Sequence, residues 1–439
     1  MNPKDGKKKP NEVKLIAHYL PQFHPFEEND KWWGKGFTEW RNVSKAKPHF
    51  KGHHQPHLPA DLGYYDLRIP EVREAQAEMA KAYGIYGFCY YHYWFGGKKL
   101  MSLPFEQMLK SKKPDFPFCV CWANENWTKR WDGREEDVLI AQNHSDEDDR
   151  AFIKDLIPAF RDNRYIRVKD KPMLLLWRPK LLPDMKRTAS IWREEAKKHG
   201  IDDLYLVAVE SWHADVPPSE FGLDASTQFA PQTVFHYKHQ IEMFNYQDVT
   251  MVNYMQTMEH LVNLPNPNYP YFRSAFPAWD NTPRREKGGF IFHGSSPLLY
   301  AYYLHKQIEL TKKHNAPEEQ YVFINAWNEW AEGAHLEPDM KHTYAYLQAT
   351  LDALTGDVVS EIKKKSFSVT DFEPLFLIPE EAKREAAKLI ELNLDLQRKN
   401  AELLDKLEDL YSARSWKMAQ GIHKFAETYK IKQILKKFK

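Results

Sequence analysis

The sequence predicts an α/β protein built on a (β/α)8 TIM barrel, followed by a C-terminal helical extension. Its short apolar runs are almost continuously apolar, as strands buried on both faces require, and helix-like stretches alternate with several of them. A doubly wound open sheet is disfavoured because no GxGxxG phosphate turn follows the first run. The eight predicted strands are residues 14–20, 86–94, 117–124, 172–177, 204–209, 223–230, 273–279 and 321–327.

Helices are expected between these runs. The stretch 69–84 has Pro70 in its first turn and ends at Gly84, and the stretch 186–200 ends at Gly200. Similar helical patterns occupy residues 147–160, 298–314 and 341–354. The first strand-to-helix loop, about residues 21–68, is long, so we expect it either to build part of a substrate site or to form a structural lid.

The character of the chain changes after about residue 358. We therefore predict a catalytic barrel over residues 14–358, a linker over 359–379 and a helical extension over 380–439. Leucines near a three–four spacing in 385–411 suggest a coiled-coil helix that joins copies of the chain into a homo-oligomer. The basic amphipathic tail, 412–439, suits peripheral contact with an anionic membrane or a partner, and equally a helix packed back on the barrel.

Composition excludes several classes of function. The formal net charge of +1 gives no global field for nucleic acid, whereas a 14% aromatic content supplies rings that stack on sugars. Cys89, Cys119 and Cys121 lie in predicted buried strands with neither a disulfide nor a zinc spacing. The basic N-terminus lacks the apolar core of a secretory signal, and no run is long enough to span a bilayer. A cytoplasmic setting is the resulting expectation.

Polar and aromatic residues gather at the ends of the predicted strands, which converge on one mouth of a barrel. Glu329 and Glu332 are the predicted catalytic carboxylates, because glycoside hydrolysis needs one carboxyl group as acid and another as base or nucleophile. A helical turn would point both the same way, although spacing alone fits two surface glutamates at a helix start. The predicted substrate-binding residues are His18, Tyr19, Gln22, Trp33, Glu39, Trp40, Tyr91, His92, Trp94, Trp122, Asn124, Glu125, Trp127, Arg178, Glu210, Trp212, Gln228, Trp279, Asp280, Trp327, Asn328 and Trp330.

Metals and cofactors are not expected. The histidines that follow predicted strands, His18, His92, His213 and His335, show no HxH, HExxH or paired acidic-ligand spacing. A lone histidine is more often a hydrogen-bonded wall of a site than a ligand. We therefore predict no catalytic metal and no cofactor.

Several motifs resemble a known family. These motifs are AHYLPQFHPFEENDKWWGKGFTEW, GFCYYHYWF, CWANENWTKRWDG, KPMLLLWRP and INAWNEWAEGAHLEPD, and over roughly residues 14–355 the chain resembles the WbsX-type proteins. These proteins are similar to glycoside hydrolase family 99, the endo-α-mannosidase and endo-α-mannanase group. The resemblance implies a (β/α)8 barrel with a retaining mechanism, in which Glu329 deprotonates the sugar 2-hydroxyl and Glu332 acts as acid and then base.

Two enzyme functions follow from this reading. The first is a retaining, endo-acting glycoside hydrolase or transglycosidase that acts on a microbial surface polysaccharide. The alternative is a glycosyltransferase of O-antigen or other surface-polysaccharide biosynthesis, because WbsX-type proteins usually carry that label. A binding protein without activity is disfavoured, since such a module needs no acid/base pair. Whether water or another sugar receives the glycosyl group stays open at this point.

Overall fold

The structure is a computed structural model of the chain. It describes residues 13–129, 134–211, 216–241, 243–246, 248–285 and 287–357, together with Lys399. The chain divides into two compact units, Met1–Val358 and Val359–Lys439, and apart from Lys399 the description concerns the first. The predicted linker, coiled coil and basic tail therefore lie outside the described residues.

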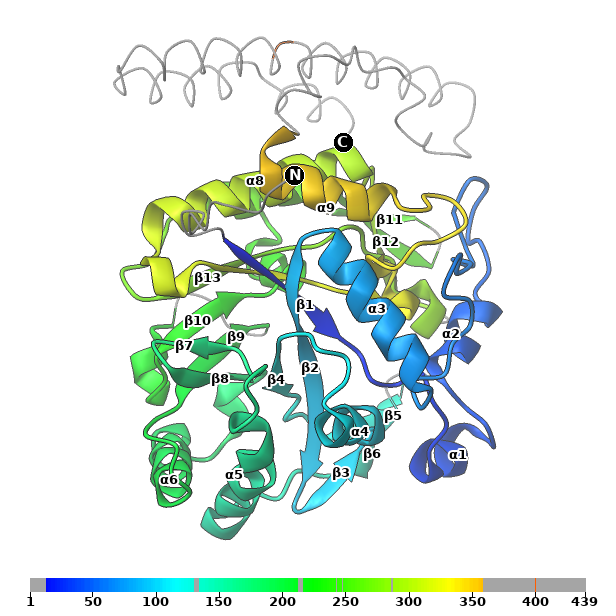
Figure 1. The fold of residues 1–439 in the computed structure, drawn as a ribbon. Coiled ribbons are helices and arrows are strands. Elements are labelled where there is room, and N and C mark those ends of the chain that lie inside the picture. The colour runs from blue at the N-terminus through cyan, green and yellow to red at the C-terminus, as the bar shows by residue number, and fades with distance from the viewer. Residues whose placement is uncertain are drawn as a thin grey trace, which may run out of the picture. The chain divides into compact units, whose positions relative to one another are not determined.

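Eight parallel strands close into a barrel (Figure 1). Neighbouring strands pair in the order in which they follow along the chain, and the last pairs with the first through Leu15–Val322 and Ile16–Phe323. Each strand overlaps one of the eight predicted apolar runs, so the barrel prediction is confirmed. The strands are β1 (Lys14–Tyr19), β2 (Ile85–Phe95), β4 (Phe118–Trp122), β8 (Lys171–Leu176), β9 (Tyr205–Glu210), β10 (Ala225–Gln228), β13 (Tyr271–Ala275) and β15 (Tyr321–Ile324).

Helices cover the outside of the barrel. Five of them match predicted helices: α3 (Pro70–Ala82), α5 (Asp146–Phe160), α6 (Met185–Lys198), α8 (Pro297–His314) and α9 (Ala345–Thr355). The sequence signals act as expected, because Ser145 caps α5 by accepting a hydrogen bond from the Asp148 backbone and acidic residues fill the first turn. Four further helices were not predicted: α4 (Leu103–Ser111), α7 (Tyr254–Asn263) and the two short helices of the first loop.

The strand–helix alternation is interrupted between β9 and β10. In the part of this connection that the structure describes, residues 216–224, the chain forms a short 3-10 helix, η3 (Pro218–Phe221), instead of an α-helix. The connection is short, and Pro217 and Pro218 remove two backbone donors from it. The expectation of a regular strand–helix repeat is wrong at this place.

Additional elements decorate the ends of the barrel strands. The long first loop carries α1 (Glu27–Trp33) and α2 (Glu39–Lys45). Some short strands form small separate sheets, and others pair with a barrel strand. Short 3-10 helices lie in the connections between strands. These elements are β3 (Lys98–Leu100), β5 (Trp127–Lys129), β6 (Arg134–Ile140), β7 (Arg167–Val168), β11 (Met243–Tyr246), β12 (Val249–Asn253), β14 (Gly289–His293), β16 (Asn328–Glu329), β17 (Ala334–His335), η2 (Pro179–Leu181), η4 (Gln232–Tyr237), η5 (Thr282–Arg284), η6 (Pro317–Glu319) and η7 (Trp330–Glu332).

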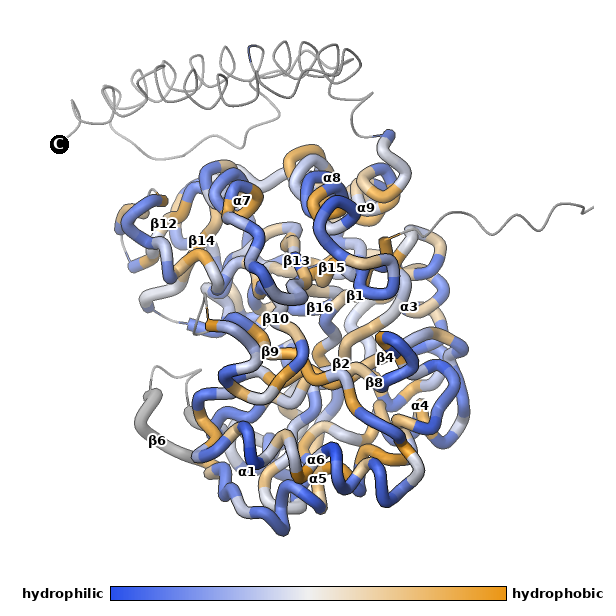
Figure 2. Tube along the Cα trace, turned by 90° about the vertical axis from the view of Figure 1, so that its left-hand side faces the viewer, coloured by the Kyte–Doolittle hydropathy of each residue, from blue (hydrophilic) through white to orange (hydrophobic). Residues whose placement is uncertain are grey.

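Apolar side chains fill both the barrel and the layer beneath its helices. Hydrophobic stretches run among the barrel strands, and hydrophilic stretches lie mainly on outer helices and loops (Figure 2). Trp122 and Trp192 are fully buried and their rings pack against each other between β4 and α6. The three cysteines are buried and free, as predicted. No helix among the described residues is long and apolar enough to cross a membrane.

Candidate active site

Glu329 and Glu332 lie in a tight turn that follows β15. β16 and β17 pair antiparallel, and η7 between them ends at Gly333, whose φ of +60° is a left-handed conformation. A Cβ on Gly333 would lie 3.0 Å from the Asp280 nitrogen, which donates to the carbonyl of Glu332 at 2.7 Å. The helical turn expected at this strand end is thus a 3-10 turn packed directly on the loop after β13.

One guanidinium group joins three glutamates at this turn. Arg284, at the end of η5, donates from Nε to Glu39 at 2.6 Å and from Nη2 to Glu329 at 2.7 Å, and its Nη1 donates to Glu332. The Glu39 side chain is fully buried, and those of Arg284, Glu329 and Glu332 are 12%, 8% and 19% exposed. The predicted catalytic pair is therefore brought together with the predicted binding residue Glu39.

The charge of this group is unbalanced. Three carboxylates face one guanidinium, so full ionisation would leave a net negative charge in a buried place. Burial raises the pKa of Glu329 to about 8; Arg284 opposes this rise, and Glu332 and Glu39 add to it. Burial likewise raises the pKa of Glu332 against the pull of Arg284. At neutral pH the pair of carboxyl groups therefore retains a proton, which is what an acid/base pair requires.

Aromatic side chains lie beside the carboxylates. Burial, and next the charge of Glu329, raise the pKa values of Tyr91 and Tyr93 well above their ordinary range. His18 stacks on Tyr91 with ring centres 5.4 Å apart and meets Phe229 edge-on. Burial lowers the pKa of His18 to about 3, so its ring is neutral. Trp177 contacts both Tyr91 and Phe229, completing an aromatic cluster inside the barrel.

Five predicted site residues are directed away from the barrel interior. Successive side chains of a strand alternate between faces, so Tyr91 points inward while its neighbours on β2 point outward. The Tyr19 hydroxyl donates to Gln76 of α3, and the Trp94 indole donates to Asp148 of α5. The residues that pack under helices in this way are Tyr19, His92, Trp94, Trp122 and Gln228.

The tryptophans nearest the glutamates in sequence are buried. Trp330 is 1% exposed, donates its indole N–H to Glu337 at 2.6 Å and stacks on His335. Trp40 packs against Trp330 and donates to the Tyr65 carbonyl. The structure thus uses these rings to support the turn instead of presenting them to a sugar. The predicted residues Trp279 and Trp327 are likewise buried, at 4% and 0% exposure.

Two of the predicted aromatic rings, those of Trp127 and Trp33, are more accessible to solvent. Trp127 is half-buried, with its ring centre 6.2 Å from that of Trp32 and 5.2 Å from that of Tyr93. Because Tyr93 senses the charge of Glu329, this strip of rings leads toward the carboxylates. Trp33 is half-buried beside Phe37. Of the predicted residues, Trp127 is thus the aromatic ring best placed to stack on a sugar.

The remaining polar residues form separate networks. The Asn124 amide exchanges two backbone hydrogen bonds with Arg178, whose guanidinium donates to Glu125 at 2.6 Å. Asn328 pairs in the same way with the Leu20 backbone, which ties the last strand to the first. Gln22 is 1% exposed. Some of the polar residues at the strand ends therefore hold the protein's own backbone and side chains in place.

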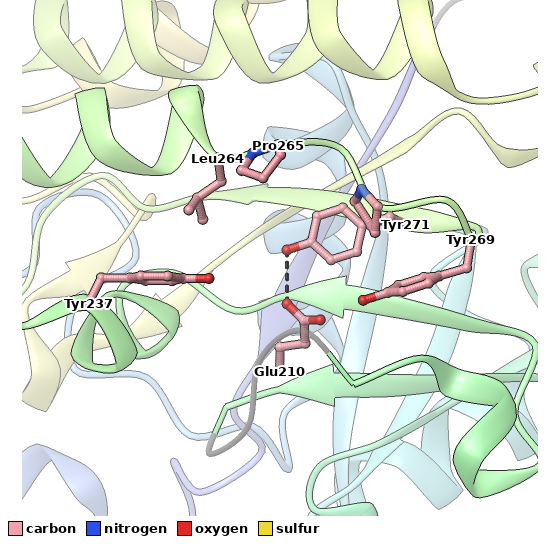
Figure 3. A pocket seen from close by; sticks show the side chains of 7 residues that line it. Glu210, Tyr237, Leu264, Pro265, Tyr269 and Tyr271 are labelled. Atoms are coloured by element: carbon pink, nitrogen blue, oxygen red, sulfur yellow. Dashed lines mark hydrogen bonds between the residues drawn. The ribbon is translucent and has the colours of Figure 1, made fainter.

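Asp280 and Glu210 are also engaged within the protein. Asp280 accepts hydrogen bonds from Gln55 at 2.7 Å and from Thr282, and it lies 2.6 Å from His53 Nε2. Glu210 accepts the Tyr271 hydroxyl at 2.9 Å in a small cavity (Figure 3). About 20 Å³ of this cavity is open to the centre of a water-sized sphere, which is room for a water molecule. Trp212 lies outside the described residues.

Arg284 is the principal site residue that the sequence did not reveal. Arg284 and Arg285 follow Asp280 closely, yet arginine pairs in loops are common and carry no motif. The signal that could have found Arg284 is the charge balance, because three glutamates at one barrel mouth require a buried cation.

Comparisons with known proteins bear on the family and the fold of the chain. Two proteins of Xanthomonas campestris pv. campestris, both named "Uncharacterized protein WxcX", are each 45% identical to the chain over 81% of its length. The alignments cover 52% of each relative, so the chain spans about half the length of the curated relatives it matches. The solved GH99 endo-α-mannosidase of Bacteroides thetaiotaomicron shares the fold, with a TM-score of 0.50 and 13% identity over 79% of this chain and 98% of that one.

The family resemblance seen in the motifs is confirmed. The sequence profile of the family described as glycosyltransferase WbsX matches residues 15–350, which is well over half of the chain and includes the barrel strands, Arg284 and both glutamates of the turn. The chain therefore belongs to the glycosyltransferase WbsX family.

Proposed function

We propose that the chain is a carbohydrate-active enzyme that breaks and remakes glycosidic bonds with the carboxyl groups of Glu329 and Glu332. The observation that carries the proposal is the guanidinium of Arg284, which holds both carboxyl groups side by side in a mostly buried site that retains a proton. The substrate class is a microbial surface polysaccharide cleaved within its chain. The family description and the aromatic strip near Tyr93 support a sugar substrate.

The proposed reaction retains the configuration at the anomeric carbon. Glu329 takes the proton of the sugar 2-hydroxyl, whose oxygen attacks C1 while Glu332 gives its proton to the departing glycosidic oxygen. The C1–oxygen bond breaks and a strained 1,2-epoxide forms on the sugar. Glu332 then removes a proton from water or an acceptor hydroxyl, which opens the epoxide at C1, and Glu329 returns its proton to the 2-oxygen.

These roles require the shared proton to lie on Glu332 when the reaction starts. In the free protein the pKa of about 8 keeps Glu329 protonated at neutral pH. A bound sugar would cover Glu332, whose side chain is the more exposed of the two at 19%, and its desolvation would favour the protonated form there. The proposal thus includes movement of the proton from Glu329 toward Glu332 as substrate binds.

A glycosyltransferase is the second candidate, and the description of the family favours it. The same two carboxyl groups could activate an acceptor hydroxyl in place of water. The difference lies in the donor, because transfer from a nucleotide sugar requires that donor, whereas hydrolysis and transglycosylation consume only the polysaccharide.

The deciding experiment incubates the full chain with mannan-type and O-antigen-type glycans, with and without nucleotide sugars. Oligosaccharides released without a nucleotide sugar, with retained anomeric configuration by NMR, support the first proposal. Products that lengthen only when a nucleotide sugar is added would instead establish the transferase. Neither release nor extension with any glycan would contradict both candidates.

Two variants test the residues in this assay. Glu332→Gln keeps a partner for Arg284 but cannot give or take the proton, so turnover should fall by about 10³-fold or more while glycan binding persists. Glu319→Gln is the matched control, since this buried glutamate precedes the opposite end of β15 and pairs with Lys169. Near-wild-type turnover of Glu332→Gln would remove Glu332 from the acid role.

A further inference from the structure

A second cluster of ligating side chains lies behind the turn that carries the glutamates. One ligand atom each from His57, His335 and Asp339 lies within 4.8 Å of the other two. His57 Nδ1 is 2.9 Å from His335 Nε2, and Asp339 Oδ2 is 3.8 Å from the same His335 nitrogen. His335 and Asp339 are 5% and 3% exposed, and His57 is half-buried.

Hydrogen bonds fix the tautomer of His335 and the orientation of Asp339 in this cluster. His335 Nδ1 is 2.9 Å from the Glu337 carbonyl, which can only accept, so the proton of a neutral His335 ring is on Nδ1. His335 Nε2 is therefore the acceptor of the hydrogen bond from His57 Nδ1, and a metal ion that binds both nitrogens takes the place of this proton, which moves to His57 Nε2 or to solvent. Asp339 uses its other oxygen, Oδ1, to accept from the Lys341 and His342 backbones, which leaves Oδ2 directed at the histidines.

We propose that His57, His335 and Asp339 bind one divalent transition-metal ion, with Zn²⁺ as the best match. Two imidazole nitrogens and one carboxylate oxygen are a common zinc ligand set. Zinc–nitrogen bonds of 2.0–2.1 Å in tetrahedral geometry separate two ligand nitrogens by about 3.3 Å, so the histidines need to move apart only slightly. A water would supply the fourth ligand.

The residues around the cluster hold its side chains in fixed orientations, as the surroundings of metal ligands usually do. Ligating histidines usually donate their second nitrogen to a carbonyl or carboxylate, and His335 does so to Glu337. The flat face of Trp330 covers the His335 ring, with centres 3.8 Å apart and planes 12° from parallel. The backbone donors of Lys341 and His342 fix the Asp339 carboxylate. The ring orientations are thus set before an ion arrives.

The ion would join two distant parts of the chain. His57 belongs to the long first loop, whereas His335 lies on β17, 278 residues later. On β17, His335 pairs with Asn328 and Ala334 pairs with Glu329. A metal bridge at this place would hold the first loop against the hairpin that carries the catalytic candidates. Its role would be structural, because none of its three ligands is among the residues that Arg284 binds.

Metal binding can be measured without any glycan, so this proposal can fail or succeed independently of the proposed function. The full chain, purified without a histidine tag and stripped with chelator, is titrated with Zn²⁺ by calorimetry and melted with and without Zn²⁺. We expect one ion per chain and a higher Tm when zinc is present. Co²⁺ in place of Zn²⁺ should give the visible absorption of a low-coordinate site with nitrogen and oxygen ligands.

Three variants locate the ion. Asp339→Asn preserves the acceptor for the Lys341 and His342 backbones but weakens the ligand, and His57→Ala removes a ligand from the exposed side. Each should weaken zinc affinity by at least about 100-fold and abolish the zinc-dependent rise in Tm. His239→Ala, at an exposed histidine, should change neither. The proposal is wrong if the wild type binds no zinc, or if both ligand variants bind zinc as tightly as the wild type does.

Discussion

Arg284 Nη2 lies 2.7 Å from a carboxylate oxygen of Glu329, and this ion pair is mostly shielded from water. The other nitrogens of the same guanidinium bind Glu39 and Glu332, so all three carboxylates depend on one side chain. A planar arginine presents its donors in a fixed fork, which sets the positions of the bound carboxylates relative to each other. The geometry of the candidate acid/base pair is therefore a property of Arg284 as much as of the two glutamates.

Replacing Arg284 with methionine should destabilise the protein strongly. Burial alone would lower the pKa of Arg284, but the charges of Glu39, Glu329 and Glu332 raise it well above its ordinary range. Removing this cation leaves buried carboxylates unpaired, at a cost of about 3–5 kcal/mol in the free energy of unfolding. Denaturant unfolding of the wild type and of Arg284→Met measures the difference.

The matched control for this prediction is Arg187→Met. Arg187 also pairs with a carboxylate, that of Asp146, but its side chain is 63% exposed. Water and salt screen such a pair, so its loss should change the unfolding midpoint little. Equal effects of the two substitutions would show that Arg284 is not a buried counter-charge.

The glutamate pair should make the stability of the protein depend on pH. Burial raises the pKa of Glu329 from an ordinary 4.5 to about 8, so between these values the folded state holds a proton that the unfolded state releases. The resulting stabilisation is complete at acidic pH and is lost as the pH rises through about 8. Its slope is at most about 1.4 kcal/mol per pH unit.

Glu329→Gln isolates this contribution. The amide does not titrate, so the free energy of unfolding of the variant should fall less steeply than that of the wild type over the same pH interval. Unfolding curves collected at several pH values provide the comparison. Parallel profiles for the two proteins would mean that Glu329 is ionised in the folded state at neutral pH.

Glu39→Gln should shift the alkaline limb of the activity profile. The charge of Glu39 adds to the burial that raises the pKa values of Glu329 and Glu332. Removing that charge should lower the pH at which the pair loses its last proton by about one unit. On a substrate identified in the glycan screen, kcat/KM should therefore fall at lower pH in Glu39→Gln than in the wild type. An unshifted limb accompanied by a uniformly lower rate would indicate that Glu39 has only a structural role.

The sequence could predict the barrel because most of its strands are buried on both faces and are mainly apolar, as in β8 and β9. It could also place Glu329 and Glu332 at a strand end. It could not predict Arg284, because the contact with Glu39 spans 245 residues and exists only once the barrel has closed.

The sequence also could not predict which side chains at the strand ends face the barrel interior. Tyr91 and His92 are neighbours on β2, yet Tyr91 faces His18 inside the barrel and His92 packs against Phe152 of α5. Both residues are polar aromatics, so their residue types do not show which of the two faces the barrel interior. Which residue faces inward follows from the register of β2 with β1 and β4, and this register exists only in the folded barrel.

Gly333→Ala should disturb the turn between Glu332 and β17. The φ of +60° disfavours any residue with a Cβ, and here the added Cβ would also lie 3.0 Å from the Asp280 nitrogen and 3.1 Å from its Cβ. The conformational penalty alone is about 1 kcal/mol, and the close approach adds roughly 1–3 kcal/mol. Because Asp280 donates to the Glu332 carbonyl, relief of the clash should displace Glu332 and lower turnover as well as stability.

Gly96→Ala separates these two effects. Gly96 has nearly the same conformation, with a φ of +56°, but a Cβ there meets nothing within 4 Å. This variant should therefore lose only the conformational part of the free energy of unfolding and keep wild-type turnover. The difference between the two variants measures how tightly the turn is packed on Asp280. If Gly333→Ala lost no more stability than Gly96→Ala, the turn would be free to shift, and the packing against Asp280 could not be what positions Glu332.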